Sequence, residues 1–211
     1  MNRDKGTFLA DISTTIERAK KQQISEDRKA ILQPLVDYIQ TKVNDGAEIN
    51  LNFICTHNSR RSQFLQIWAQ TAADHLGLNV NCYSGGVEVT EFNPRAVESI
   101  KRNGFAVKAE GEINPVYSIY HSENGNPITA FSKLYHAAGK KGDLFAGVMS
   151  CAHADETCVN VVGAEARIPV RYNDPKRFDG TPEEAARYDE TSLQAASEMF
   201  YVFSEISLPQ E

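Results

Sequence analysis

The feature that most constrains how this chain folds is the succession of a strand, a short polar loop and a helix within residues 49–75. Large apolar residues alternate along 49–55, which predicts a buried strand. From Phe64 to Ala72 apolar residues recur at helical spacing, and Gly77 follows as a stop signal. The loop between these elements has room only for a tight turn. Such a turn directs backbone N–H groups at a helix N-terminus, where unpaired donors and the macrodipole stabilise an anion.

The loop carries the side chains that an oxyanion site needs. Cys55 and Arg61 form a Cys-x5-Arg pattern, and Ser62 follows directly. The N–H donors and the guanidinium favour the thiolate form of Cys55, which is the nucleophilic form. Arg61 is expected to bind two oxygens of a tetrahedral oxyanion with its planar fork, and Ser62 to donate to the thiolate. The predicted oxyanion-binding residues are Thr56, His57, Asn58, Ser59, Arg60 and Arg61.

The same pattern has a plainer interpretation, in which Cys55 is a buried structural residue and Arg61 lies on the surface nearby. Arginine is a common residue, so Cys-x5-Arg is weak on its own. Its position after a strand and before a helix favours the functional interpretation. Asn58 also suits that interpretation, because its amide can brace the loop and asparagine tolerates a left-handed backbone.

Composition and charge narrow the class of protein. The 211 residues suffice for one sizeable core with an appendage, and the net charge of −6 argues against a general nucleic-acid binder. No apolar run approaches the roughly 20 residues of a membrane span, and residues 1–7 lack the apolar segment of a signal peptide. We therefore expect a cytoplasmic protein that binds neither nucleic acid nor membrane. Its four cysteines are then expected to be catalytic, redox-active or metal-binding rather than structural disulfides.

The chain divides into an N-terminal helical extension, 1–47, and a main domain, 48–211. Two apolar stripes at helical spacing predict a helical hairpin in 1–47, packed on the main domain or on a partner. In the main domain, strands are predicted at 80–84, 144–150 and 168–172, with Cys82 as a packing residue in the first. The Asn-Gly dipeptide within 112–131 predicts an inserted β-hairpin.

Residues 151–158 form a second candidate site, with a cysteine at each end. Cys151 follows a predicted strand, and in an open α/β sheet the carboxyl ends of strands meet at the ligand crevice. We therefore expect Cys151 near Cys55, and Cys158 on a loop within reach of Cys151. Two alternatives are a zinc site that includes His153 and a pair of inert surface thiols. Zinc is disfavoured because no second pair of ligands lies nearby, and no metal is assigned.

Asp174 follows the last predicted strand and precedes a proline. A carboxyl group at that end of the sheet can act as an acid or a base if it reaches the bound anion. The Asp-Pro pair is common in turns, so it gains weight only together with the Cys55 loop.

Together these features resemble the low-molecular-weight tyrosine phosphatase superfamily, and within it the thioredoxin-coupled arsenate reductases. The resemblance covers roughly residues 49–206 and omits the N-terminal helices. It implies an α/β fold, a three-layer sandwich with a central four-stranded parallel sheet and helices on both faces. The motifs that carry it are the loop at 55–62, the helix start at 93–98, the pair Asp174-Pro175, and the cysteines at 151 and 158, whose spacing is that of the reductases.

The loop departs from the family pattern at two positions. His57 stands where members usually carry glycine, and Arg60 stands where many carry a second cysteine. We expect His57 to be a non-glycine residue in a strained backbone conformation and to add positive charge near the anion.

The resemblance implies a thiol relay that requires no metal or organic cofactor. Cys55 attacks arsenate held by the loop and Arg61, while Asp174 assists loss of an oxygen. Cys151 then displaces arsenite, and Cys158 resolves the resulting disulfide for a thioredoxin-like reductant. The alternative enzyme is a phosphotyrosine phosphatase, in which Cys55 forms a phosphocysteine and the other two cysteines are not needed. A non-enzymatic alternative is an anion-sensing or partner-binding module.

Overall fold

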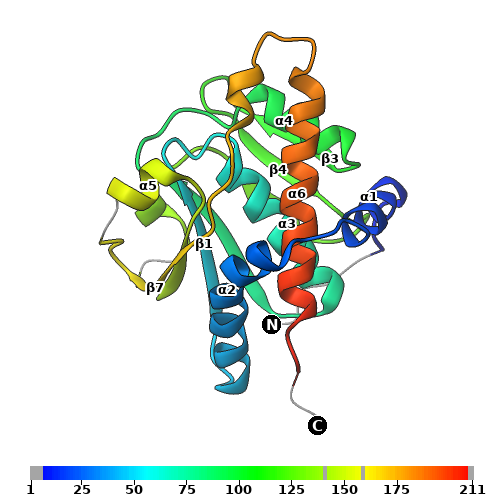
Figure 1. The fold of residues 1–211 in the computed structure, drawn as a ribbon. Helices are drawn as coiled ribbons and strands as arrows, with labels where there is room; N and C mark the ends of the chain where they lie inside the picture. Colours follow the sequence, from blue (N-terminus) through cyan, green and yellow to red (C-terminus); the bar gives the residue numbers. More distant parts are fainter. Residues whose placement is uncertain (1–6, 140–141, 158–159, 209–211) are drawn as a thin grey trace.

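The fold is a three-layer α/β sandwich, seen in a computed structural model that describes residues 7–139, 142–157 and 160–208 (Figure 1). The central sheet has the order β2-β1-β6-β7 and all of its strands are parallel. This confirms the predicted four-stranded sheet. The strands are β1 Ile49–Cys55, β2 Val80–Gly86, β3 Ala106–Glu110, β4 Val116–Tyr120, β5 Ile128–Ala130, β6 Phe145–Met149 and β7 Ala164–Pro169.

Helices cover both faces of this sheet. Every residue of β1 is buried, as expected for a central parallel strand. Phe53 of β1 belongs to the main apolar cluster, whereas its neighbour Ile54 belongs to a second cluster on the other face, together with Ala154 of α5. The helices are α1 Ala10–Lys20, α2 Glu26–Asn44, α3 Arg61–Leu76, α4 Pro94–Arg102, α5 Ala152–Thr157 and α6 Glu184–Ser204, with short 3-10 turns η1 Tyr135–Ala137 and η2 Pro175–Phe178.

The two N-terminal helices pack on the main domain through α6, which Figure 1 shows between them. Ile12 and Ile16 of α1 and Leu35 and Ile39 of α2 join the main apolar cluster. Ser25 caps α2 by accepting a hydrogen bond from the Arg28 N–H. The division of the chain at residue 47 stays a prediction. The part of the chain that the structure describes contains no helix whose length and hydrophobicity suit a transmembrane span.

The predicted hairpin is present and is larger than expected. β4 pairs with β5 across a seven-residue connection, and β3 adds a third antiparallel strand on the other side of β4. The last strand of the central sheet also differs from its prediction at 168–172, because β7 pairs with β6 along Ala164–Pro169. After Pro169 the chain still forms a backbone hydrogen bond near the end of β6, from the Tyr172 N–H to the Ser150 carbonyl. These residues are not part of the β6–β7 ladder.

Parallel pairing brings the carboxyl ends of three strands to one edge of the sheet. Cys55 lies opposite Gly86 in the register of β1 and β2, and Ile54 lies opposite Met149 of β6. The chain after β6 therefore delivers Cys151 to the edge that carries the Cys55 loop. The fold therefore places Cys151 next to the Cys55 loop.

Gly85 and Gly86 allow other backbone to approach this edge. A Cβ atom added at Gly85 would lie 2.2 Å from the Tyr135 Cα, and one at Gly86 would lie 2.8 Å from the Asn58 N atom. Neither position has space for a side chain without backbone movement. Glycine is therefore required where β2 passes the loop.

We predict that Gly85→Ala lowers the free energy of unfolding by about 2 kcal/mol or more, because overpacking against backbone cannot be relieved by a side-chain rotation. Urea unfolding followed by circular dichroism measures the change. Gly147→Ala in β6 is the matched control, since a Cβ there would meet its nearest atom, Ile54 Cδ1, at 3.5 Å. Equal stability of the two variants would contradict the close approach at Gly85.

Candidate active site

The loop between β1 and α3 turns through a left-handed residue at Asn58, whose φ is 47°. The expectation that His57 holds the strained conformation is wrong, because only Asn58 and Asn114 have positive φ among the described non-glycine residues. The His57 carbonyl accepts a hydrogen bond from Ser132 Oγ at 2.8 Å, and its half-exposed ring lies 3.3 Å from Glu88 Oε2. His57 thus faces a carboxylate rather than adding an unpaired charge to the loop.

Asn58 braces the loop from the inside, as its residue type predicts. Its Nδ2 donates to Ser62 Oγ at 2.9 Å, and its Oδ1 accepts from the Lys133 N–H at 3.1 Å. Gln63 Nε2 donates to the Asn58 carbonyl at 2.9 Å and also to the Phe131 carbonyl. These hydrogen bonds fix the loop to α3 and to the segment after β5. Burial lowers the pKa of the Lys133 side chain in that segment to about 8.

Cys55 lies at the base of the loop with its sulfur 3.0 Å from Ser62 Oγ. Asn58 Nδ2 donates into the same hydroxyl oxygen, so the hydroxyl hydrogen of Ser62 is available for the sulfur. Cys55 and Ser62 are both buried. A hydroxyl that donates to this sulfur stabilises a thiolate and would stabilise it again as a leaving group.

Arg61 and Asp174 meet across the opening of the loop. The NH2 atom of Arg61 lies 2.9 Å from Asp174 Oδ2, and its NH1 atom donates to the Tyr172 carbonyl at 3.2 Å. The buried Nε of Arg61 has no hydrogen-bond partner in the described part of the chain. An oxyanion in the loop would supply the partner that this donor lacks.

Arg60 also binds Asp174, a contact that the sequence did not reveal. Its Nε donates to Asp174 Oδ1 at 2.9 Å, and the N–H of Lys176 donates to the same oxygen at 3.0 Å. Burial alone would raise the pKa of Asp174, but the charges of Arg61 and Arg60 outweigh burial and hold that pKa below its usual value. Asp174 is therefore a carboxylate at neutral pH when both arginines face it.

Cys151 lies directly beside the loop. Its sulfur is 3.5 Å from Thr56 Oγ1 and accepts a hydrogen bond from the Ala154 N–H at 3.3 Å. The side chain is only 1% exposed. The structure thus places Cys151 at the site where Cys55 is expected to react. Cys158 lies outside the described residues.

Arg28 of α2 is a second residue near the site that the sequence did not indicate. It lies in the N-terminal segment, for which no functional residue was predicted. Its guanidinium donates to both oxygens of the buried Glu198 carboxylate, at 2.9 and 2.7 Å, and to the Arg171 carbonyl at 3.1 Å. It also stacks 4.6 Å from the centre of the Tyr172 ring. Burial raises the pKa of Tyr172, so its hydroxyl stays protonated and donates to Glu198.

This network ties the N-terminal extension to the segment that carries Asp174, because Arg28 holds residues 171 and 172 on one side and Arg61 holds the Tyr172 carbonyl on the other. The sequence contains one indication of this ion pair. Glu198 lies in a largely apolar stretch of α6, where a buried charge requires a partner.

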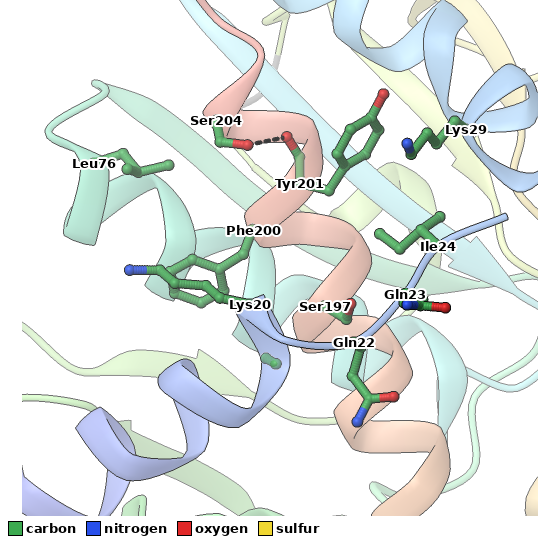
Figure 2. Close-up of a pocket in the computed structure, with 11 residues that line it drawn as sticks. Lys20, Gln22, Gln23, Ile24, Lys29, Leu76, Ser197, Phe200, Tyr201 and Ser204 are labelled. Carbon is green, nitrogen blue, oxygen red and sulfur yellow. Dashed lines mark hydrogen bonds between the residues drawn. The ribbon is translucent and has the colours of Figure 1, made fainter. Parts of the chain in front are cut away.

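Two cavities border these elements. One of about 490 Å³ opens between Asp174, Arg61 and Ala152, the residue that follows Cys151. The other, of about 540 Å³, lies between the α1–α2 connection and α6 (Figure 2). Its described lining includes Lys20, Ile24 and Phe200 but no cysteine, histidine or carboxylate. Of these two cavities, only the first is lined by Asp174 and Arg61.

Comparison with known proteins bears on this site. The family model described as low molecular weight phosphotyrosine protein phosphatase matches residues 50–113. An arsenate reductase of Halalkalibacterium halodurans is 29% identical over 63% of this chain and 78% of its own length. The arsenate reductase of Bacillus licheniformis is 30% identical over the same shares, and that of Bacillus cereus AH187 is 32% identical over 58% of this chain and 74% of its own length.

We predict that Arg28→Gln lowers the free energy of unfolding by about 3 kcal/mol, because it leaves the buried Glu198 carboxylate without its counter-charge. Glu198→Gln in the same background should recover part of that loss, which urea unfolding of the single and double variants measures. Lys29→Gln is the control, since Lys29 pairs at the surface with Glu26. Additive losses in the double variant would contradict the coupling between Arg28 and Glu198.

Proposed function

Because this chain belongs to the low-molecular-weight phosphotyrosine protein phosphatase family, with arsenate reductases among its relatives, we propose that it reduces arsenate to arsenite through a cysteine relay. The observation that carries this proposal is the position of Cys151, whose sulfur lies 3.5 Å from Thr56 Oγ1 in the anion loop. A phosphatase that uses Cys55 alone has no need of a second thiol there. A relay requires one.

The first step is attack by the Cys55 thiolate on arsenic. An S–As bond forms and one arsenate oxygen leaves as water, while the loop N–H groups and Arg61 hold the remaining oxygens. Arg61 Nε, which has no partner in the described chain, supports the assignment of Arg61 as an oxyanion ligand. Ser62 stabilises the thiolate, and Asp174 assists the departing oxygen.

The second step transfers two electrons to arsenic. The Cys151 thiolate attacks the Cys55 sulfur, an S–S bond forms, and the S–As bond breaks with its electron pair moving to arsenic, which leaves as arsenite. The N–H of Ala154 supports this role by donating to the Cys151 sulfur. Cys158 then attacks Cys151, which frees the Cys55 thiolate and leaves a Cys151–Cys158 disulfide.

An external dithiol closes the cycle by reducing that disulfide, and a thioredoxin-like protein is the reductant that we propose. Such a relay runs only in a reducing compartment, so the cytoplasm is the location that fits it. The site residues in this scheme need no metal or organic cofactor.

Hydrolysis of phosphate monoesters is the second candidate function. The same loop suits phosphate, which has nearly the shape of arsenate, and Asp174 lies across the loop opening from Arg61. Cys55 would form a phosphocysteine that water then hydrolyses. The two functions differ in whether Cys151 and Cys158 are needed.

We predict that arsenate drives steady NADPH oxidation when the protein is coupled to thioredoxin and thioredoxin reductase. Cys151→Ser and Cys158→Ser should each abolish steady turnover, and Cys55→Ser should abolish both arsenate reduction and aryl-phosphate hydrolysis, because a hydroxyl is not ionised at neutral pH. Cys82→Ala is the control, since Cys82 lies within β2.

The outcome that would exclude the relay is an absence of turnover in the natural protein with brisk hydrolysis of aryl phosphates by every variant that retains Cys55. The protein would then be a phosphatase in which Cys151 and Cys158 are bystanders.

A further inference from the structure

We propose that Arg60 determines which reaction the site favours, by holding Asp174 as a carboxylate that can relay a proton but cannot donate one of its own. This inference rests on the proposed function and deepens it. It makes the site a poor catalyst of ester cleavage and a suitable one for arsenate.

Arg60 is built into the site more firmly than a surface arginine would be. It precedes the first residue of α3, and it is 8% exposed. Its Nε lies 2.9 Å from Asp174 Oδ1, and its NH2 lies 3.5 Å from Asp174 Oδ2. The side chain of Arg60, which the sequence predicts as part of the oxyanion-binding loop, is thus directed to Asp174.

The two arginines have separable tasks. Arg61 contacts Asp174 Oδ2 through NH2, and its buried Nε, which has no partner among the described residues, is the donor available to a substrate oxygen. Both side-chain hydrogen bonds of Arg60 go to Asp174. An anion in the loop would share the charge of Arg61, whereas Arg60 directs its charge to Asp174.

Other groups facing Asp174 do not replace Arg60. The N–H of Lys176 donates to Oδ1 and also favours the ionised form. Tyr188 of α6 faces the same region, but its hydroxyl donates to Asp179 Oδ1 at 2.8 Å. Burial raises the pKa of Tyr188, and its hydrogen bond to Asp179 raises it further, so it remains neutral. Among the described residues, Arg60 and Arg61 are the cations in contact with the Asp174 carboxylate.

Ester cleavage needs a proton that an ionised Asp174 lacks. When the Cys55 sulfur bonds to phosphorus, the P–O ester bond breaks and its electron pair goes to the leaving oxygen. A phosphomonoester dianion carries no proton, so the leaving oxygen departs unprotonated unless the acid supplies one. The rate should then depend steeply on how well the alcohol tolerates negative charge.

Arsenate brings its own protons. Dihydrogen arsenate carries two, so the thiolate can form the S–As bond while one oxygen leaves as water and both protons leave with it. A carboxylate at Asp174 helps by accepting the proton of one hydroxyl and passing it to the departing oxygen. Arg60 therefore keeps Asp174 in the ionised form that the reaction with arsenate uses.

The experiment compares hydrolysis of p-nitrophenyl phosphate, which has a good leaving group, with phenyl phosphate, which has a poor one. In Arg60→Gln we expect kcat/KM for phenyl phosphate to rise about tenfold relative to that for p-nitrophenyl phosphate, because general acid catalysis is regained in part. The double variant Arg60→Gln/Asp174→Asn should return the ratio to that of the natural protein. Arg177→Gln removes an exposed positive charge from the neighbouring η2 turn and should leave the ratio unchanged.

Arg60 is buried, so thermal unfolding of each variant is measured alongside. Arg60→Lys keeps a positive charge but loses the planar fork, and it should shift the ratio in the same direction by a smaller factor. A ratio that stays at its natural value in the folded variants overturns the proposal, and so does a shift that survives in the double variant. Absence of arsenate turnover would refute the reductase assignment separately, since the ester comparison needs only Cys55 and the loop.

Discussion

The ladder hydrogen bonds on both edges of β1 hold the candidate site together, because they bring three strand ends to one place. β1 pairs in parallel with β2 and with β6, so Cys55 lies opposite Gly86 and the chain after β6 reaches the loop with Cys151. A one-residue slip in either pairing would turn alternate side chains to the opposite face. The buried Phe53 and Ile54, which face different apolar clusters, oppose that slip.

Charge pairing then connects remote segments to this edge. Asp174 is bound by two arginines from the start of α3, and the residues just before it are bound by Arg28 of α2. Arg28 is in turn held by Glu198 of α6. The N-terminal extension is therefore joined by hydrogen bonds to the segment that carries the candidate carboxyl group, and it also contributes apolar side chains to the core.

The parts of the structure that the sequence predicted are those with local causes. The strand, the tight turn and the helix follow from residues that are adjacent in the chain, and Asn58 braces the loop as its side chain suggested. Asn58 adopts the left-handed conformation that its residue type tolerates, whereas His57 does not adopt the strained conformation that was expected of it. The pairing of Arg60 with Asp174 could not be predicted, because the two residues are 114 positions apart and no local pattern pairs them.

The pairing of Arg28 with Glu198 has a consequence for how the chain is made. The two residues are 170 positions apart. At roughly 5 to 20 residues per second, a ribosome needs about 10 to 30 s to synthesise the intervening chain. During that interval Arg28 lacks its partner, and α6 is not present to cover α3. The Cys55 thiol, which is 3% exposed after folding, is therefore made long before the native fold can shield it from oxidants.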